Sequence, residues 1–250
     1  MIPPPPRPEA HWPRPLWHAS GEDAELLYFV FGRFPADLDI GLPTGITATR
    51  YAHADLRQWE GYPLTGALGH TFTDEAPDTL ASARATEHVL RIAGRVADPS
   101  DLDYLRHTLR AIVRLFDTGA VAVVDPQVSG LFGRSRWIRD VASGNERTLR
   151  QHFLVLCEGD PDAPGRKWVH TRGLRKFARP DISLTGVPEN EANRAGVLCQ
   201  QLADMQALGG MFSDGQPLPV DDVGVFLVRP GGTRDDPRFH NTHVAMHWPD

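Results

Sequence analysis

Cysteine, lysine and long apolar runs are scarce in this sequence. Two cysteines and two lysines occur among 250 residues, and no apolar run approaches the ~20 residues that a membrane-spanning helix needs. The missing runs argue against a membrane-inserted protein. The cysteine count excludes a disulfide-stapled scaffold, and because Cys157 and Cys199 both lie in apolar stretches, we expect two buried free thiols.

The N-terminus lacks the features of a secretory signal peptide. It has neither the apolar core nor the small-residue cleavage site of such a peptide, so we expect a soluble, cytoplasmic protein. Seven of the first fifteen residues are proline, which fixes many φ angles and removes hydrogen-bond donors. We therefore expect residues 1–20 to form a proline-rich tail or strap, which Trp12, Leu16 and Trp17 could dock onto the rest of the protein.

Several residue patterns of known chemistry are also missing. The chain has no phosphate-binding loop ending in Gly-Lys-Ser/Thr, no Gly-x-Ser-x-Gly elbow, no His-Glu-x-x-His pair and no Gly-x-Gly-x-x-Gly after a predicted strand. Nucleotide hydrolysis and dinucleotide redox chemistry therefore have no support in the sequence. His240, His243 and His247 look like a metal cluster, but on a strand His243 and His247 lie about 13 Å apart, too far to share one ion. We expect neither a metal nor a cofactor.

Charge is unevenly distributed along the chain. The net charge is -6, yet residues 134–179 hold eleven Arg or Lys against five acids, a local balance of +6 that leaves -12 for the remainder. This split predicts a basic face on an acidic body, which could attract a small anionic ligand or an acidic partner. The alternative is that each arginine pairs with an acid from elsewhere in the chain. The acidic total disfavours nucleic-acid binding.

The first half of the chain reads as alternating strands and helices. The clearest element is a helix capped by Ser100, whose apolar positions follow a 3,4,3,4 spacing and must face a sheet. These positions are Leu102, Leu105, Leu109, Ile112 and Phe116. The other expected elements are strands at 26–31, 44–51, 88–96 and 120–124 and short helices at 77–84 and 135–142.

The second half of the chain is also predicted to contain both strands and helices. We expect a helix between Pro188 and Gly209, with Ala195, Leu198, Leu202 and Met205 on its buried face. The expected strands are 153–157, which reads as a central strand, 167–171, 182–185, 223–228 and 243–248. Strands outnumber helices, and several follow one another without a crossover helix. The sequence therefore predicts an α+β fold with a mixed, largely antiparallel sheet and helices packed on it. We expect one domain over residues 21–250, with a division into 21–145 and 146–250 as the alternative.

The best candidate site is the segment 170–181, where a cationic cluster is mixed with glycine and proline. Its candidate ligand-binding residues are His170, Arg172, Arg175, Lys176 and Arg179. Guanidinium groups bind phosphate and carboxylate with paired hydrogen bonds, and these side chains could converge if residues 173–178 form a helical turn. The structural alternative is that Arg179 pairs with Asp181 or a distant acid, Gly173 supplies a special backbone angle, and Leu174 and Phe177 anchor a connection between strands.

This segment also carries a resemblance. Residues 171–182, the helix that follows and the Asp214-Gly215 turn resemble an uncharacterised bacterial domain-of-unknown-function family, whose pattern runs Thr-x-Gly-Leu/Met-x-x-Phe-Gly-x-Pro-Glu/Asp. Residues 88 to about 132 are similar to the strand-helix-strand that precedes this pattern in the family. The resemblance implies no activity, although such domains often occur beside bacterial toxin and secretion genes. Ala178 stands where the pattern has glycine, so no role that needs a bare backbone there can be carried over.

Two hypotheses about function follow. The first is a non-enzymatic binding protein, of the immunity or accessory type, that masks a protein partner through its acidic body or its basic loop. The second is an enzyme that acts on a small phosphate- or carboxylate-bearing substrate at the 170–181 segment, with His170 as an acid or base. The sequence contains no set of residues that identifies a catalytic role.

Overall fold

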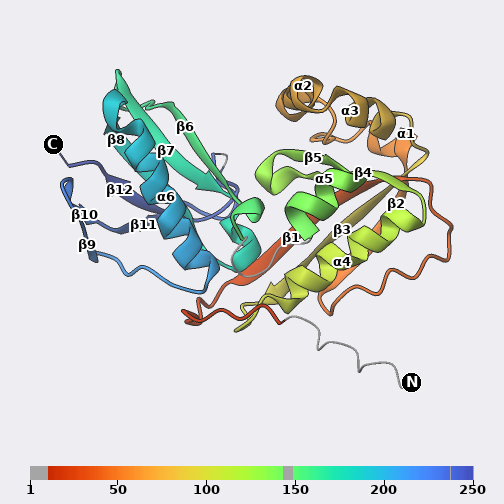
Figure 1. The fold of residues 1–250 in the computed structure, drawn as a ribbon, viewed down its shortest axis with the longest axis horizontal. Coiled ribbons are helices and arrows are strands. Elements are labelled where there is room, and N and C mark those ends of the chain that lie inside the picture. Colours follow the sequence, from red (N-terminus) through yellow and green to blue (C-terminus); the bar gives the residue numbers. More distant parts are fainter. Residues whose placement is uncertain (1–10, 143–148, 237, 250) are drawn as a thin grey trace, which may run out of the picture.

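Two five-stranded sheets form the framework of the computed structural model, which describes residues 11–142, 149–236 and 238–249 (Figure 1). The first sheet is antiparallel throughout. Its order is β2 (Ile46–Ala52), β3 (His88–Ala97), β1 (Asp23–Gly32), β4 (Ala120–Asp125) and β5 (Gly130–Gly133). The second sheet has the order β11 (Arg229–Gly231), β12 (His243–His247), β8 (Asp181–Pro188), β7 (Arg166–Arg172) and β6 (Leu154–Gly159).

The α+β class with largely antiparallel sheets is confirmed. In the second sheet only β12 and β8 are parallel among the strand pairs of the described residues. Because β8 is followed by a helix before the chain returns to β12, this pair has the crossover that parallel neighbours need. The strands nevertheless divide between two sheets, where the sequence suggested one. A separate two-stranded ribbon contains β9 (Pro217–Val220) and β10 (Gly224–Leu227).

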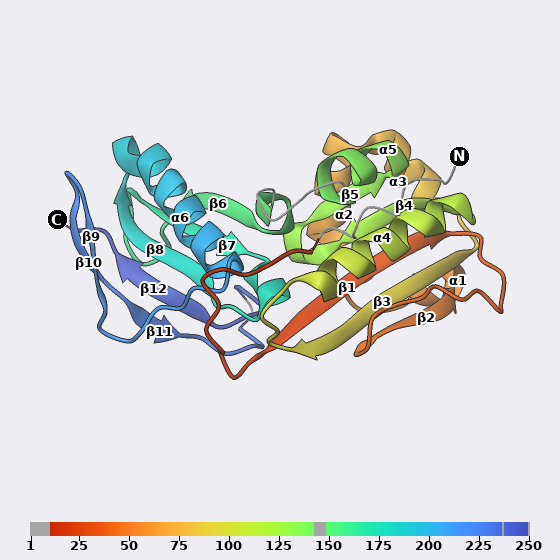
Figure 2. The same cartoon turned by 60° about the horizontal axis from the view of Figure 1, so that its bottom comes forward.

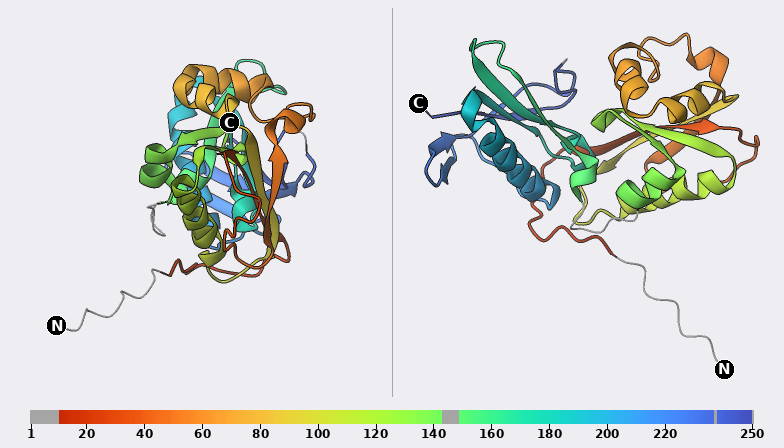
Figure 3. Two further views of the ribbon diagram at one scale, coloured as in Figure 1. Left: turned by 90° about the vertical axis from the view of Figure 1, so that its right-hand side faces the viewer. Right: turned by 45° about the horizontal axis from the view of Figure 1, so that its top comes forward.

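Alternate residues of β1 supply two cores on opposite faces of the first sheet. Tyr28 and Val30 belong to the larger core, whereas Phe29 and Phe31 belong to the smaller one. The smaller core is covered by α1 (His53–Leu56), α2 (Gly66–Glu75) and α3 (Pro77–Arg84), and Figure 3 shows α2 and α3 above the sheet and α4 below it. The helix α3 has the predicted bounds. Gly69 within α2 lets the chain pack closely, because a Cβ there would lie 2.6 Å from the carbonyl oxygen of Leu64.

The helix α4 (Asp103–Asp117) covers the other face of the first sheet with its predicted apolar stripe. Its five stripe residues, Leu102, Leu105, Leu109, Ile112 and Phe116, are all at most 8% exposed. The predicted cap was wrong, because Ser100 does not cap this helix. The amide of Asp103 donates instead to Oδ1 of Asp101, 3.0 Å away, while the amide of Leu102 donates to the carbonyl of Trp12. An isolated bridge between Pro13 and Asp101 also ties the strap to the segment just before the helix.

The helix α6 (Ala192–Ala207) packs on the second sheet through small residues. Ala195, Cys199, Ala203 and Ala207 are fully buried, whereas the leucines predicted for this face are only partly buried. Small side chains at a spacing of four let the helix approach the sheet closely. Gly209, with a φ of 102°, ends the helix region as predicted. Shorter helical segments are α5 (Arg134–Arg136), η1 (Pro126–Val128), η2 (Trp137–Ala142), η3 (Leu149–His152), η4 (Leu174–Phe177) and η5 (Glu189–Glu191).

Two predictions about β6 were wrong. This strand lies at the edge of the second sheet and not at its centre. Cys157 is consequently exposed, while Cys199 is buried as predicted, and both thiols are free. The short apolar run of β6 gave no indication of how many neighbours the strand would have, because periodicity does not report sheet position.

Residues 11–20 form a strap that connects the two halves of the chain. Trp12 is 2% exposed, and the amide of Leu16 donates to the carbonyl of Leu208 at the end of α6. Figure 2 shows this strap, in red, passing from the start of α4 to the end of α6. The predicted docking is thus made by Trp12, whereas Leu16 and Trp17 remain 43% and 37% exposed. Within the part of the chain that the structure describes, no helix is both long and apolar enough to cross a bilayer.

Candidate functional site

The candidate segment is a short connection between β7 and β8 with a special backbone conformation at each end. The η4 turn (Leu174–Phe177) supplies the helical turn on which the convergence of these side chains was conditional, and it is bracketed by Gly173 with a φ of 109° and Ala178 with a φ of 54°. A Cβ at position 173 would lie 2.7 Å from the carbonyl oxygen of His152, so glycine is required there on two grounds. Ala178 adopts the left-handed conformation that glycine would favour.

Arg179 joins the two halves of the molecule. One of its Nη atoms donates to Oδ2 of Asp98 at 2.7 Å, and its remaining donors reach four backbone carbonyls, those of His18, Ala178, Gly209 and Gly210. Burial alone would raise the pKa of Asp98, but hydrogen bonds from Arg179 and Arg14 outweigh it and hold that pKa below its usual value. Arg179 is 2% exposed, so its guanidinium is fully used inside the protein.

Lys176 makes a second ion pair across the halves. Its Nζ lies 2.5 Å from Oδ2 of Asp125, at the end of β4, and also donates to the carbonyl of His152. Both side chains are at most 2% exposed. Burial lowers the pKa of Lys176 and raises that of Asp125, and each shift is opposed by the charge of the other group. This pair lies within the protein interior.

Arg175 makes the third connection, at the edge of a cavity. Its Nη2 lies 2.6 Å from Oε2 of Glu25 on β1, and its Nη1 donates to the carbonyl of His240. Glu25 also accepts a hydrogen bond from Nε of Arg95, so two arginines share this carboxylate. Three cations of the connection are therefore paired with three different acids, and Arg179 pairs with a distant acid, as the structural alternative from the sequence expects.

Arg172, the last residue of β7, differs from these three cations. Its guanidinium forms no ion pair within residues 11–142, 149–236 and 238–249, and its Nε, like that of Arg175, is buried without a hydrogen-bond partner. A buried donor that lacks a partner is costly, by about 1 to 3 kcal/mol. Arg172 is thus the cation of the candidate segment that is available to a ligand.

The space beside Arg172 is a cavity of about 250 Å³ between the two sheets. We call it the junction cavity. Its apolar walls come from Leu27 on β1, Pro126 on η1 and Phe239 in the loop before β12. The polar lining residues are Glu25, Gln127, Arg172, Arg175, Asp181 and His240. Arg172 and Arg175 are thus brought together here, whereas His170, Lys176 and Arg179 do not line the cavity.

Asp181 is a site residue that the sequence reasoning did not identify. It begins β8, is fully buried, and accepts hydrogen bonds from the Thr171 hydroxyl, the Leu174 amide and the Asn241 side-chain amide. Burial raises the pKa of Asp181 to about 7, although these three donors and the charge of Arg172 oppose the shift. The sequence does contain an indication of this residue, because Asp181 directly precedes an apolar strand and follows the arginine cluster. An aspartate is rarely fully buried unless it has a partner.

His170 serves the packing of the second sheet. Its side chain is fully buried and stacks on Trp168 at a centroid distance of 3.8 Å, with Phe239 packed edge-on. Burial lowers the pKa of His170, while its contact with Glu158 at 3.4 Å opposes that shift. The ring lies beneath Phe239 and not in the junction cavity.

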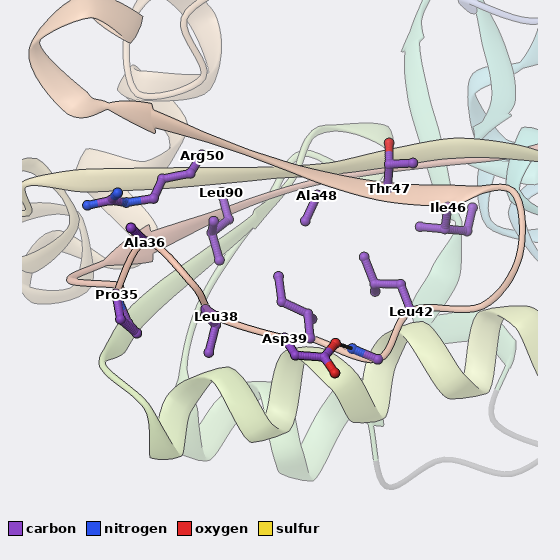
Figure 4. A pocket seen from close by; sticks show the side chains of 12 residues that line it. Pro35, Ala36, Leu38, Asp39, Leu42, Ile46, Thr47, Ala48, Arg50 and Leu90 are labelled. Atoms are coloured by element: carbon purple, nitrogen blue, oxygen red, sulfur yellow. Dashed lines mark hydrogen bonds between the residues drawn. The ribbon is translucent and has the colours of Figure 1, made fainter.

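A second hollow lies between the loop after β1 and strands β2 and β3 (Figure 4). It has a volume of about 440 Å³, and Leu38, Leu42 and Leu90 contribute apolar side chains to its lining. Its charged residues, Asp39 and Arg50, are exposed, so water screens them and weakens any pull on a ligand. The junction cavity combines a buried unpaired donor with a buried acid and is therefore the better candidate site.

No metal centre emerges among the described residues, where no three His, Cys, Asp or Glu side chains come together in a way that could hold an ion.

Comparisons of the chain with protein-family models, curated proteins and solved structures gave no match. The family resemblance described above therefore rests on its motif residues alone, and the function has to be argued from the site.

Proposed function

We propose that the protein binds a small ligand bearing a carboxylate or a phosphate in the junction cavity, without transforming it. The observation that carries this proposal is the guanidinium of Arg172, which has no ion pair, includes a buried Nε without a hydrogen-bond partner, and belongs to a residue that lines the cavity. A bound carboxylate or phosphate would supply the missing acceptor, and the paired geometry of a guanidinium suits both groups.

The surroundings of Arg172 support a ligand of limited charge. Arg175 adds a second positive charge at the cavity, but Glu25 neutralises it at 2.6 Å. Leu27, Pro126 and Phe239 contribute apolar surface to the cavity, and a less polar environment strengthens the attraction between Arg172 and an anion. Among the residues that line the cavity, Arg172 is thus the cation without an acid partner.

An enzyme acting on the same anionic ligand is the second candidate, and Asp181 is the observation that favours it. A carboxyl group with a pKa near 7 can act as a general acid or base at neutral pH. An Asp181→Asn substitution separates the two roles. A binding protein would retain ligand binding in this variant, whereas an enzyme would retain binding and lose its turnover.

An immunity or accessory role would require a protein partner on another surface. Lys176 and Arg179 are buried, and the Arg175 side chain is 16% exposed, so the basic connection presents little positive charge to a partner. The acidic body is then the contact surface for such a partner. We therefore favour anion binding over an immunity or accessory role. A cytoplasmic location stays a prediction from the sequence.

The proposal is tested by a thermal-shift screen of the full chain against small carboxylates, inorganic phosphate and phosphate esters. We expect at least one anion to raise the midpoint of unfolding in the wild type, and Arg172→Gln to weaken its binding by about 10- to 100-fold. Arg33→Gln is the matched control, because Arg33 lies just beyond the opposite end of β1 and is 80% exposed. Equal stabilisation of the Arg172→Gln variant and the wild type would contradict the proposal.

A further inference from the structure

We infer that the ligand of the junction cavity is a monocarboxylate with a small apolar body, held between the guanidinium of Arg172 and the neutral carboxyl group of Asp181, and that it binds together with a proton. This inference rests on the proposed function and specifies the ligand class and the regulation of the same site. It is carried by the charges, the hydrogen bonds and the size of the cavity.

The charge around the cavity matches one negative charge. Arg172 and Arg175 contribute two positive charges, and Glu25 removes one of them through its contact with Arg175. Counted over the residues that line the cavity, the net charge is then +1 while Asp181 is neutral, and zero once Asp181 is ionised. A monocarboxylate balances the first state, whereas a phosphate dianion would leave a buried excess of negative charge, which is costly.

The hydrogen bonds of Asp181 determine where its proton resides. The Thr171 hydroxyl accepts a hydrogen bond from the Ile182 amide, so its own hydrogen is directed to Oδ1 of Asp181, which also accepts from the Leu174 amide. The Asn241 Nδ2 donates to Oδ2 of Asp181 and to the carbonyl of Arg179. Since both acceptor sites of Oδ1 are occupied, the proton belongs on Oδ2, which still has one site free.

A protonated Asp181 can therefore donate to a carboxylate that also contacts Arg172. Both residues line the cavity, and they are close enough for the charge of Arg172 to affect Asp181. A hydrogen bond from a carboxylic acid to a carboxylate is short and strong because the acceptor is ionised. The bound anion would at the same time oppose the ionisation of Asp181, so ligand and proton would favour each other's binding.

Charged groups on the elements around Asp181 affect the pKa of its carboxyl group and thereby the coupling between ligand and proton. Arg172 on β7 and Lys176 on η4 favour its ionised form, and the pKa of Asp181 nevertheless stands at about 7 because burial outweighs them. The other charged or titratable groups at the cavity are Arg175, Glu25 and His240. A carboxylate at Arg172 would cancel the charge of that arginine and shift the balance further toward the protonated acid.

The size and lining of the cavity limit the body of the ligand. A volume of about 250 Å³ lies below the roughly 300 to 1,000 Å³ of sites for drug-sized ligands. The walls formed by Leu27, Pro126 and Phe239 suit a short aliphatic chain or a single ring. Benzoate, phenylacetate and hexanoate therefore serve as probes, with phenyl phosphate and inorganic phosphate as the competing class.

The inference is tested by isothermal titration calorimetry of the wild type with these five anions at about pH 6 and about pH 8. We expect carboxylates to bind more tightly than phosphates, with affinity falling by up to about tenfold per pH unit above pH 7. Titration at about pH 8 in two buffers of different ionisation enthalpy should show uptake of a proton on binding. This readout needs no variant and stays informative even where a substitution impairs folding.

Substitutions separate this inference from the proposed function. Asp181→Asn should flatten the pH dependence of carboxylate binding, while Asp214→Asn, on an exposed turn, should leave it unchanged. If Arg172→Gln abolishes binding but phosphates bind better than carboxylates, or binding takes up no proton, the inference fails and the proposed function stands. If Arg172→Gln leaves the binding of every probe unchanged, both fail.

Discussion

Asp181 and Lys176 are both fully buried, but only Lys176 has an oppositely charged partner. Lys176 has the carboxylate of Asp125 2.5 Å away, whereas Asp181 accepts hydrogen bonds from three neutral groups and has no ion pair within the described ranges. A buried charge with a partner keeps its ionised form, and one without a partner tends to lose it. The two residues thus illustrate the difference between a structural ion pair and a group that can titrate in a site.

The raised pKa of Asp181 predicts a loss of stability toward neutral pH. Its folded pKa of about 7 exceeds the ordinary value of 3.8, so between these values the folded protein keeps a proton that the unfolded chain has released. This single group should therefore lower the free energy of unfolding by up to about 1.4 kcal/mol per pH unit as pH rises through that range. Urea unfolding of the wild type and Asp181→Asn from about pH 5 to about pH 8 measures the difference, and parallel pH profiles would contradict it.

At the scale of single residues, prediction from the sequence succeeded where few other residue types could adopt the required conformation. Gly173 was expected to supply a special backbone angle, and it does so at a φ of 109°. The partners of the cations could not be predicted, because Asp98 and Asp125 lie 81 and 51 residues from Arg179 and Lys176. No local pattern encodes a contact across such separations. Arg172 could be placed in the candidate set, but its lack of a partner is visible only in three dimensions.

At the scale of elements, the left-handed backbone conformation of the residues on either side of the η4 turn allows a prediction about stability. Gly173→Ala should destabilise the protein by about 1 to 3 kcal/mol, because it adds backbone strain and brings a Cβ to 2.7 Å from the carbonyl of His152. Ala178→Gly should be much milder, since glycine adopts the observed φ of 54° without strain. Denaturant unfolding of both variants tests this pair, and an equal loss in the two would show that the turn geometry does not control the effect.

Elements were predictable where periodicity and packing agree. The stripe of α4 was correct at all five positions because large aliphatic residues recur on one face. The buried face of α6 was misjudged because its contact with the sheet uses Ala195, Cys199 and Ala203, and hydrophobicity alone gives alanine little weight against leucine. Likewise, the run in β6 could not distinguish an edge strand from a central one, so Cys157 was expected inside and lies at the surface.

At the scale of the whole molecule, the basic connection fastens the second half to the first. Asp98 is the centre of this junction, since it accepts from Arg179 and Arg14 and from the amide of Ser20. The uneven charge distribution read from the sequence therefore describes, in part, ion pairs between the two halves. A division of the chain near residue 145 was an alternative from the sequence, but the patterns of the strands could not decide between one sheet and two, because each pattern is compatible with either.

Removing the charge of Asp98 should weaken this junction strongly. Asp98→Asn would leave Arg179 and Arg14 buried without their carboxylate, and we expect a loss of about 3 to 5 kcal/mol in the free energy of unfolding. Asp214→Asn is the control, because its pair with Arg229 is more than half exposed on both sides and should cost at most about 1 kcal/mol. Similar losses in the two variants, measured by urea unfolding, would refute the structural role given to Asp98.

The availability of Arg172 to an anion is the claim on which the functional account depends. Nitrogen-15 NMR of arginine Nε groups reports on it directly, with the Arg172 signal assigned by its absence in Arg172→Gln. Because Nε of Arg172 has no acceptor among the described residues while Nε of Arg179 donates to Gly210, the account predicts that benzoate shifts the first signal and leaves the second in place. An Arg172 signal that stays unmoved by carboxylates and phosphates alike would contradict it.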